Sequence, residues 1–316
     1  ERGISLSKNS VSYIVPEGLF KTRSYKPCVD IINNTCKINF ITYFSEMVFD
    51  NAVTGNLIFL LTSKEVEKID HIDTQEYVFN NNFNLEQLKG NEDPIISKIS
   101  SFNFPKLDEV CHTFKGMVVK DRKSHISSNQ ESRKDIFLLG KSITNWVIHT
   151  PFYTDYSELT IVGGTKKKEK HDISPRILIR RTGSELVSAL LEKPALTEST
   201  LYSCWSKSDC FETKYIFALL NSSIYKYFVE HQIVTNQQAF PQILLTDIKE
   251  LPIPKIDTSH QKKFVILVNK ILDSKNINTE SNISEFEKQL NELVFDLFKL
   301  TTSERQSVLN SLDQNN

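Results

Sequence analysis

Short, continuous apolar runs characterise the first part of the chain. Three of them, at 11–15, 38–43 and 57–62, have the length and composition of strands buried inside a sheet. Pro16 ends the first run, and residues 24–34, between the first two, show the apolar spacing of a helix. Strand, helix and strand in this order predict α/β structure here.

A polar, asparagine-rich stretch follows at 64–100. Helices are predicted inside it near 84–89 and 94–100. Pro105 then interrupts regular structure within the segment 102–107, so we expect a boundary between two domains at this point.

Beyond this boundary, short mixed elements alternate with polar loops as far as residue 256. Two better-defined helices are predicted at 213–230 and 246–250. Pro252 and Pro254 follow directly and end the domain.

The remaining residues predict a helical tail, with amphipathic helices at 259–274 and 282–299 and a short third helix at 302–312 that begins at a capping signal. One face of the second helix is apolar at helical spacing and consists of Phe286, Leu290, Leu293, Val294 and Leu297. The pattern as a whole divides the chain into 1–104, 105–257 and 258–316.

Composition narrows the class of protein. With 316 residues, 39% of them hydrophobic and 24% charged, the chain can form two globular domains. The net charge of −1 excludes a protein coated in positive charge, but a near-neutral total can still contain a local basic face for DNA. Five scattered cysteines favour reduced thiols in a cytoplasmic protein over a disulfide framework or a zinc site. We expect no membrane span, and the opening at Glu1 suggests a piece of something longer.

Several sequence blocks occur in an order that matches one protein family. Ser-Tyr-Ile-Val-Pro-Glu-Gly-Leu-Phe at 12–20 looks like the strand and proline after a catalytic motif, and Pro-Arg-Ile-Leu-Ile-Arg-Arg-Thr-Gly at 175–183 looks like the central strand of a DNA-recognition domain. Further blocks lie at 46–61, 110–121, 216–222, 240–254, 261–272 and 290–301. In this order they resemble the TaqI-like N6-adenine-specific DNA methyltransferases, including the fused restriction–modification enzymes called type IIG.

The resemblance implies an architecture. Residues 1–104 would be the C-terminal part of a methyltransferase catalytic domain, an α/β remnant of a Rossmann-like fold. Residues 105–257 would be an α+β target-recognition domain that reads double-stranded DNA, and 258–316 its helical tail. The alternative is a protein-interaction or vestigial module from a truncated restriction–modification gene, in which the tail helices pair with another subunit and no DNA is bound.

The family's catalytic motifs are missing from this sequence. The chain contains no Asn-Pro-Pro-Tyr and no glycine-rich loop for S-adenosylmethionine, and in the family both precede the block at 12–20. We therefore expect no catalytic residue in this chain, no bound cofactor and no activity alone. S-adenosylmethionine would serve the complete enzyme, and the partners would be the missing N-terminal half or a restriction subunit, in a bacterial or archaeal cytoplasm.

Phe49 is the residue that the resemblance assigns to the flipped adenine. Enzymes that methylate a base in DNA take it out of the helix, and the family's late catalytic motif supplies an aromatic ring that stacks on it. Ordinary core packing beside a strand is the alternative for Phe49.

Arginines and lysines supply the other DNA-contact candidates. Arg180 and Arg181 follow an apolar strand, so they should point to opposite faces, where each could contact guanine or phosphate or form a structural salt bridge. The loop 115–134 is basic, and we favour DNA contact there over a solvated turn. Its candidates are Lys115, Lys120, Arg122 and Lys123. For the lysines of 165–170 the two alternatives are equal.

Asparagine and glutamine side chains in the loop 234–242 are candidate base readers, since both amides can bind adenine at N6 and N7. The candidates are Asn236, Gln238 and Gln242. A polar turn without a partner is the alternative.

The histidines have no close metal-ligand spacing, and we expect no metal site.

Overall fold

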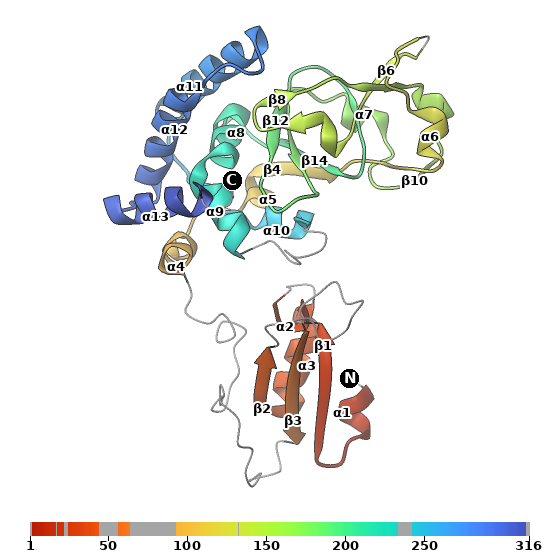
Figure 1. The fold of residues 1–316 in the computed structure, drawn as a ribbon, viewed down its shortest axis with the longest axis vertical. Coiled ribbons are helices and arrows are strands. Elements are labelled where there is room, and N and C mark those ends of the chain that lie inside the picture. The colour runs from red at the N-terminus through yellow and green to blue at the C-terminus, as the bar shows by residue number, and fades with distance from the viewer. Residues whose placement is uncertain are drawn as a thin grey trace. The chain divides into compact units, whose positions relative to one another are not determined.

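The computed structural model describes residues 2–16, 18–21, 25–43, 56–63, 93–131, 133–232 and 242–313. They form two compact units, the first from the described residues up to Ser63 and the second from Asp93 onward. Figure 1 shows the elements of both.

The first unit is a small mixed α/β structure. Its described helices are α1 (Arg2–Leu6), α2 (Gly18–Lys21) and α3 (Lys26–Thr35), and its described strands are β1 (Ser10–Pro16), β2 (Cys36–Tyr43) and β3 (Asn56–Ser63). The strand order is β1-β3-β2, and β3 is antiparallel to both neighbours. The three predicted strands and the helix between the first two are confirmed.

The core of this unit lies where α3 meets the sheet. Val29 and Ile32 of α3 are buried there, together with Leu57 and Phe59 of β3, which alternate along the strand as a half-buried sheet requires. β1 differs from the prediction of a buried strand, because it lies at an edge among the described strands and leaves Ile14 39% exposed.

The second unit contains the remaining described elements. Its strands are β4 (Cys111–Lys115), β5 (Val118–Val119), β6 (Asp135–Leu138), β7 (Ile143–Thr144), β8 (Val147–Ile148), β9 (Phe152–Thr154), β10 (Ile161–Gly163), β11 (Arg176–Arg180), β12 (Ser188–Leu191), β13 (Leu196–Thr197) and β14 (Leu201–Ser206). Its helices are α4 (Pro94–Ser101), α5 (Leu107–Val110), α6 (Arg122–His125), α7 (Lys168–His171), α8 (Thr213–Asn221), α9 (Ser223–Gln232), α10 (Leu245–Lys249), α11 (Thr258–Ile277), α12 (Ser284–Leu297) and α13 (Thr302–Asp313).

An antiparallel sheet of order β12-β11-β14-β4 is the centre of this unit. Ile177 and Ile179 of β11 belong to the cluster that the helices share, whereas Leu178 packs on the opposite side with Val187 and Leu201. Because both faces of β11 are buried, its sequence is a continuous apolar run rather than an alternating one. The prediction that 175–183 contains a central strand is confirmed.

Smaller sheets lie at the far end of the central sheet from the tail helices (Figure 1). β13, β6 and β9 form one, and β5 pairs with β10 in another. Met117 and Phe137 are fully buried between these strands. They give the loops that follow β5 and β10 a packed base.

Helices α8 and α9 lie between the central sheet and the tail (Figure 1). The sequence predicts one helix over 213–230, but the backbone turns to an extended conformation at Ser222, whose N–H and Oγ both bond back to the Leu219 carbonyl. This break allows two short helices to pack at different angles. Every residue of α8 from Tyr215 to Asn221 is buried.

The tail helices share one hydrophobic core with the central sheet. Val268 and Ile271 of α11 and Leu290 and Phe295 of α12 belong to the same buried cluster as Ile177. The predicted apolar face of the second tail helix is therefore used inside this unit, at Leu290 and Val294 most completely. None of the described helices is long and apolar enough to span a membrane.

Helix α4 also packs in the second unit, although the sequence places the boundary after it. Asp93 caps the helix by accepting a hydrogen bond from the Ile95 N–H at 2.8 Å. Lys98 pairs with Glu304 of α13 at 2.7 Å. The stacked rings of Phe102 and Phe104 then lie edge-on against Phe298.

A candidate nucleic-acid interface

Arg181 forms a side-chain pair with Gln242. Its Nη2 donates to Oε1 of Gln242 at 2.8 Å, and both side chains are half-buried. The backbone holds the two residues in place. The Arg181 N–H donates to the Thr200 carbonyl at 2.9 Å, and the Ile243 N–H donates to the Arg181 carbonyl at 2.9 Å.

Arg180 lies on the other row of the strand, with Arg176 and Leu178, as the period of two requires. Its Nε is buried and has no hydrogen-bond partner among the described residues. The side chain lies over Gly183, where an added Cβ would be 3.5 Å from Nη2 of Arg180. Gly183 has a φ of +114°, a backbone conformation in which a side chain would be strained.

The loop after β5 presents basic side chains in two different situations. Lys120 and Lys123 are exposed, and neither has an ion pair within the part of the chain that the structure describes. Arg122 is half-exposed and pairs with Glu198 at 3.3 Å. Glu198 also accepts hydrogen bonds from the N–H and hydroxyl of Thr200, so it anchors this loop to the central sheet.

The loop before β11 likewise divides its lysines. Lys168 donates to Asp135 at 2.6 Å, and this hydrogen bond raises the pKa of Lys168. Burial opposes ionisation of Asp135, but hydrogen bonds from Lys168 and the Tyr156 N–H outweigh it and lower the pKa of Asp135. Lys168 is thus a structural lysine, while Lys166, Lys167 and Lys170 are exposed.

A buried arginine that the sequence analysis did not single out supports these loops. Arg176 is fully buried, and its guanidinium donates to the carbonyls of Ile173 at 2.6 Å and of His171 and Ala195, each at 2.5 Å. Burial lowers its pKa to about 10. An arginine inside the apolar strand block was the available signal, because such a residue is buried only where acceptors surround it.

His171 completes this network. One ring nitrogen contacts the Thr165 carbonyl at 3.0 Å and the other lies 3.2 Å from the Thr197 N–H. The first must donate and the second must accept, so the ring is neutral, in agreement with burial lowering its pKa. His171 therefore has a structural role in this network.

Comparison with known protein families identifies the part of the chain that contains these loops and strands. A family model described as the TaqI-like C-terminal specificity domain matches residues 135–253. These residues form a TaqI-like C-terminal specificity domain. The match runs from β6 to the segment after α10, and it includes Arg180, Arg181 and Gln242.

Solved structures of restriction–modification proteins are similar to this chain to different degrees. The type IIL restriction–modification enzyme MmeI, solved in complex with DNA, is 12% identical and matches with a TM-score of 0.56, covering 98% of this chain and 50% of that chain. The HsdS subunit from Thermoanaerobacter tengcongensis is 16% identical, with a TM-score of 0.37 over 67% of this chain and 52% of that one. The type IIG restriction endonuclease BpuSI is 11% identical, with a TM-score of 0.40 over 92% and 47%.

The chain spans about half the length of these proteins. No curated protein matches it. The MmeI likeness shows a shared fold, which is that of the specificity domain with its flanking elements and C-terminal helices.

Some of the remaining predicted contacts lie among the described residues and others lie outside them. Lys115 is half-buried at the end of β4, where its carbonyl accepts a hydrogen bond from the Thr165 N–H at 3.0 Å. Phe49, Asn236 and Gln238 lie outside the described residues.

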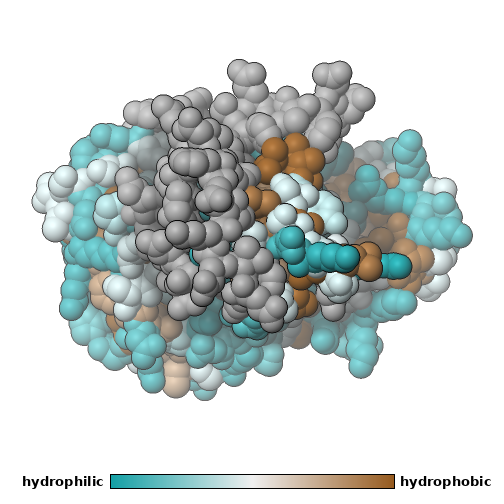
Figure 2. All heavy atoms as spheres, turned by 90° about the horizontal axis from the view of Figure 1, so that it is seen from below, coloured by the Kyte–Doolittle hydropathy of each residue, from teal (hydrophilic) through white to brown (hydrophobic). Residues whose placement is uncertain are grey.

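Hydrophilic residues cover most of the described surface on the face that Figure 2 shows.

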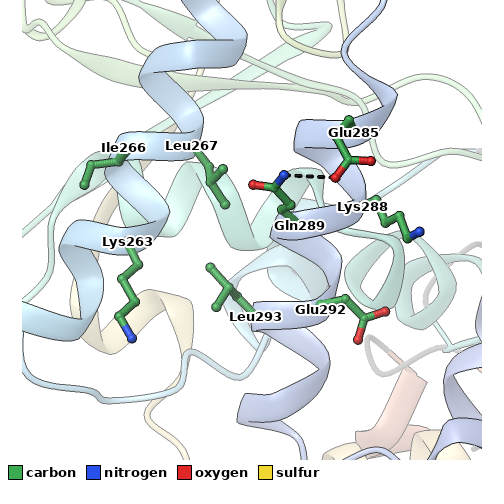
Figure 3. A pocket seen from close by; sticks show the side chains of 8 residues that line it. All are labelled: Lys263, Ile266, Leu267, Glu285, Lys288, Gln289, Glu292 and Leu293. Carbon is green, nitrogen blue, oxygen red and sulfur yellow. Dashed lines mark hydrogen bonds between the residues drawn. The ribbon is translucent and has the colours of Figure 1, made fainter.

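A groove of about 490 Å³ lies between α11 and α12, on the helices that follow the specificity domain (Figure 3). Leu267 and Leu293 form its apolar floor, and Lys263 and Glu292 lie at its rim. None of its lining residues is a predicted DNA contact. Among the described residues no group of histidine, cysteine, aspartate and glutamate gathers at metal-binding distance.

Proposed function

We propose that the specificity domain binds double-stranded DNA and reads its sequence, as the C-terminal part of an adenine-specific DNA methyltransferase of a restriction–modification system in the cytoplasm. The observation that carries this is the family match over 135–253, which includes the Arg181–Gln242 pair. The MmeI structure of the same fold is a complex with DNA.

The charge distribution supports phosphate contacts by the domain's loops. Lys120 and Lys123 are exposed and free of ion pairs among the described residues, so binding DNA would break no internal interaction of theirs. Arg122 keeps the loop in place through Glu198. A local basic loop on a chain of net charge −1 is the arrangement that the sequence analysis expected.

The topology of the first unit supports its origin in a methyltransferase sheet. β1 and β2 are both antiparallel to β3, so they are parallel to each other, and α3 lies between them in sequence. This is a βαβ unit with a reversed strand inserted, a mixed arrangement that many doubly wound sheets contain. We propose that S-adenosylmethionine binds only when the upstream half is joined, and that Phe49 then stacks on the flipped adenine.

The alternative role as a protein-interaction module receives less support. It assigned the apolar faces of the tail helices to a partner subunit. In the structure Leu290, Val294 and Phe295 of α12 are buried against the same core as the central sheet, so these faces already have an internal use.

Salt-dependent binding to duplex DNA tests the proposal. Displacement of counterions makes affinity fall by about 10³-fold between 50 and 200 mM salt for a protein with six phosphate contacts. We expect a labelled duplex of mixed sequence to show such a fall in fluorescence anisotropy titrations of the whole chain. Absence of duplex binding at low salt and high protein concentration would show that the proposed function is wrong.

Two lysines of the loop after β5 are expected to contact phosphates. The double variant Lys120→Ala/Lys123→Ala should bind less tightly to every sequence and lower the log–log salt slope by about 2. The matched control is Lys262→Ala/Lys288→Ala, which removes the same charge from exposed positions of the tail. Equal slopes for the two double variants would exclude these phosphate contacts.

A further inference from the structure

The hydrogen-bonding groups of the Arg181–Gln242 pair are constrained by chemistry. A guanidinium has only donors, so Gln242 must accept the 2.8 Å bond through Oε1. The amide Nε2 of Gln242 is then directed away from that bond and carries two further donors. No other side-chain hydrogen bond and no ion pair of Arg181 occurs among the described residues.

The pair therefore presents donors only, apart from the second lone pair on Oε1. The free donors are the unused N–H groups of the guanidinium and the two of the amide. A surface of this kind fits a ligand with adjacent acceptors. A ligand that places its own hydrogen-bond donor next to the guanidinium would bind this surface less well.

Backbone contacts hold both residues of the pair in position. Thr182 and Gln242 form an antiparallel bridge beside the Ile243–Arg181 hydrogen bond. The hydroxyl of Tyr202, from the neighbouring strand β14, donates to the Ile243 carbonyl at 3.0 Å. Backbone hydrogen bonds and the Tyr202 hydroxyl thus connect both partners to the central sheet.

We propose that Arg181, positioned by Gln242, binds the major-groove edge of a guanine through O6 and N7 at one position of the recognised sequence. Guanine is the base that presents two adjacent acceptors and no donor on that edge. Adenine would bring its N6 amino group, and cytosine its N4 amino group, against the donors of the pair. The inference rests on the proposed function of sequence-specific DNA binding.

This assignment changes the role expected for Gln242. The sequence suggested that its amide reads adenine, which requires Oε1 to accept from N6 while Nε2 donates to N7. In the structure Oε1 already accepts from Arg181, so an adenine N6 amino group would have to share this oxygen and would lie next to the guanidinium donors. Gln242 becomes a positioning residue, and the fork of Arg181 makes the base contact.

Selection from duplexes with randomised positions tests the inference. The whole chain is mixed with the duplex pool, bound molecules are sequenced, and base preferences are compared between the unchanged protein and its variants. Arg181→Lys keeps the charge but loses the fork, so we expect preference for guanine to fall by roughly 5- to 150-fold at one position only, the range that 1–3 kcal/mol corresponds to. Gln242→Leu should weaken the preference for guanine at the same position.

The control variant is Arg305→Lys, which makes the same change at a tail arginine paired with Glu292 and Asp296. It should leave all base preferences unchanged. Melting temperatures show whether each variant is folded, and Arg181→Lys and Gln242→Leu alter different partners, so either one that folds decides the matter.

The possible failures are distinguishable. If the unchanged protein enriches no sequence, the proposed function and this inference are both overturned. If it enriches a sequence whose guanine preferences survive both variants, the inference alone is overturned. A uniform loss of affinity with unchanged preferences would identify Arg181 as a phosphate contact and exclude the guanine contact.

Discussion

Arg176 shows that a charged side chain can be part of this protein's core when acceptors surround it. Its guanidinium donates to three backbone carbonyls and lies 3.3 Å from the Ser203 hydroxyl through Nε. The residues that supply those carbonyls, His171, Ile173 and Ala195, belong to the segments flanking β11 and β13. One side chain therefore connects two segments of the specificity domain, the one before β11 and the one before β13.

Replacing Arg176 should destabilise the protein strongly. Arg176→Met fills similar space but leaves buried carbonyls without donors, each worth about 1–3 kcal/mol. We expect the free energy of unfolding in urea to fall by about 3 kcal/mol or more. Arg133→Met, at a partly exposed ion-paired arginine, is the control and should change it little. Similar values for both variants would contradict the structural role of Arg176.

At the scale of elements, the tail is joined to the central domain by packing and by a specific polar contact. Trp146, which has a φ of +71°, packs edge-on against Phe217 of α8. Its indole N–H donates to Glu287 of α12 at 2.8 Å. This bond links the turn between β7 and β8 to a helix far along the chain.

A double-mutant cycle measures that link. Trp146→Phe keeps the ring but removes the N–H, and Glu287→Gln removes the charge that strengthens the bond. Hydrogen bonds to charged groups contribute about 1.5–3 kcal/mol, so we expect a coupling of about 1 kcal/mol or more in the free energy of unfolding. A coupling of zero would mean that this hydrogen bond does not contribute to holding α12 against the domain.

At the scale of the whole molecule, two units carry different parts of the proposed function. The second contains the specificity domain, and the first contains the sheet that we assign to a methyltransferase edge. Residues 1–316 include no Asn-Pro-Pro-Tyr and no glycine-rich cofactor loop. The proposed function of this chain is therefore recognition, and methyl transfer is assigned to the catalytic half that carries those motifs.

We expect the purified chain to transfer no methyl group to DNA. Incubation with radiolabelled S-adenosylmethionine and duplex DNA should leave the DNA unlabelled, because this sequence has neither the glycine-rich cofactor loop nor the Asn-Pro-Pro-Tyr motif of the family. A methyltransferase half supplied in trans should restore transfer, and Phe49→Ala should then reduce it. Formation of N6-methyladenine by the chain alone would refute this prediction.

Local patterns in the sequence were sufficient for most elements. The runs at 11–15 and 57–62 became β1 and β3, and the spacing at 282–299 became α12, because hydrophobic periodicity is a local property. The break at Ser222 was missed, since a helix interrupted to fit between a sheet and other helices depends on tertiary packing. The predicted domain boundary near residue 104 differs from the structure for the same reason. Helix α4 precedes that boundary but packs in the second unit through Asp93 and Lys98.

By itself, the sequence determined the order of elements, the family of the specificity domain and the residue types available for DNA. Tertiary structure alone decided which of those residues are free to act. Arg122 and Lys168 are ion-paired, Arg176 is enclosed by carbonyls, and Arg181 is oriented by Gln242. The physical reason is that a side chain's hydrogen-bonding capacity depends on the partners that folding brings to it, and 61 positions separate Arg181 from Gln242 along the chain.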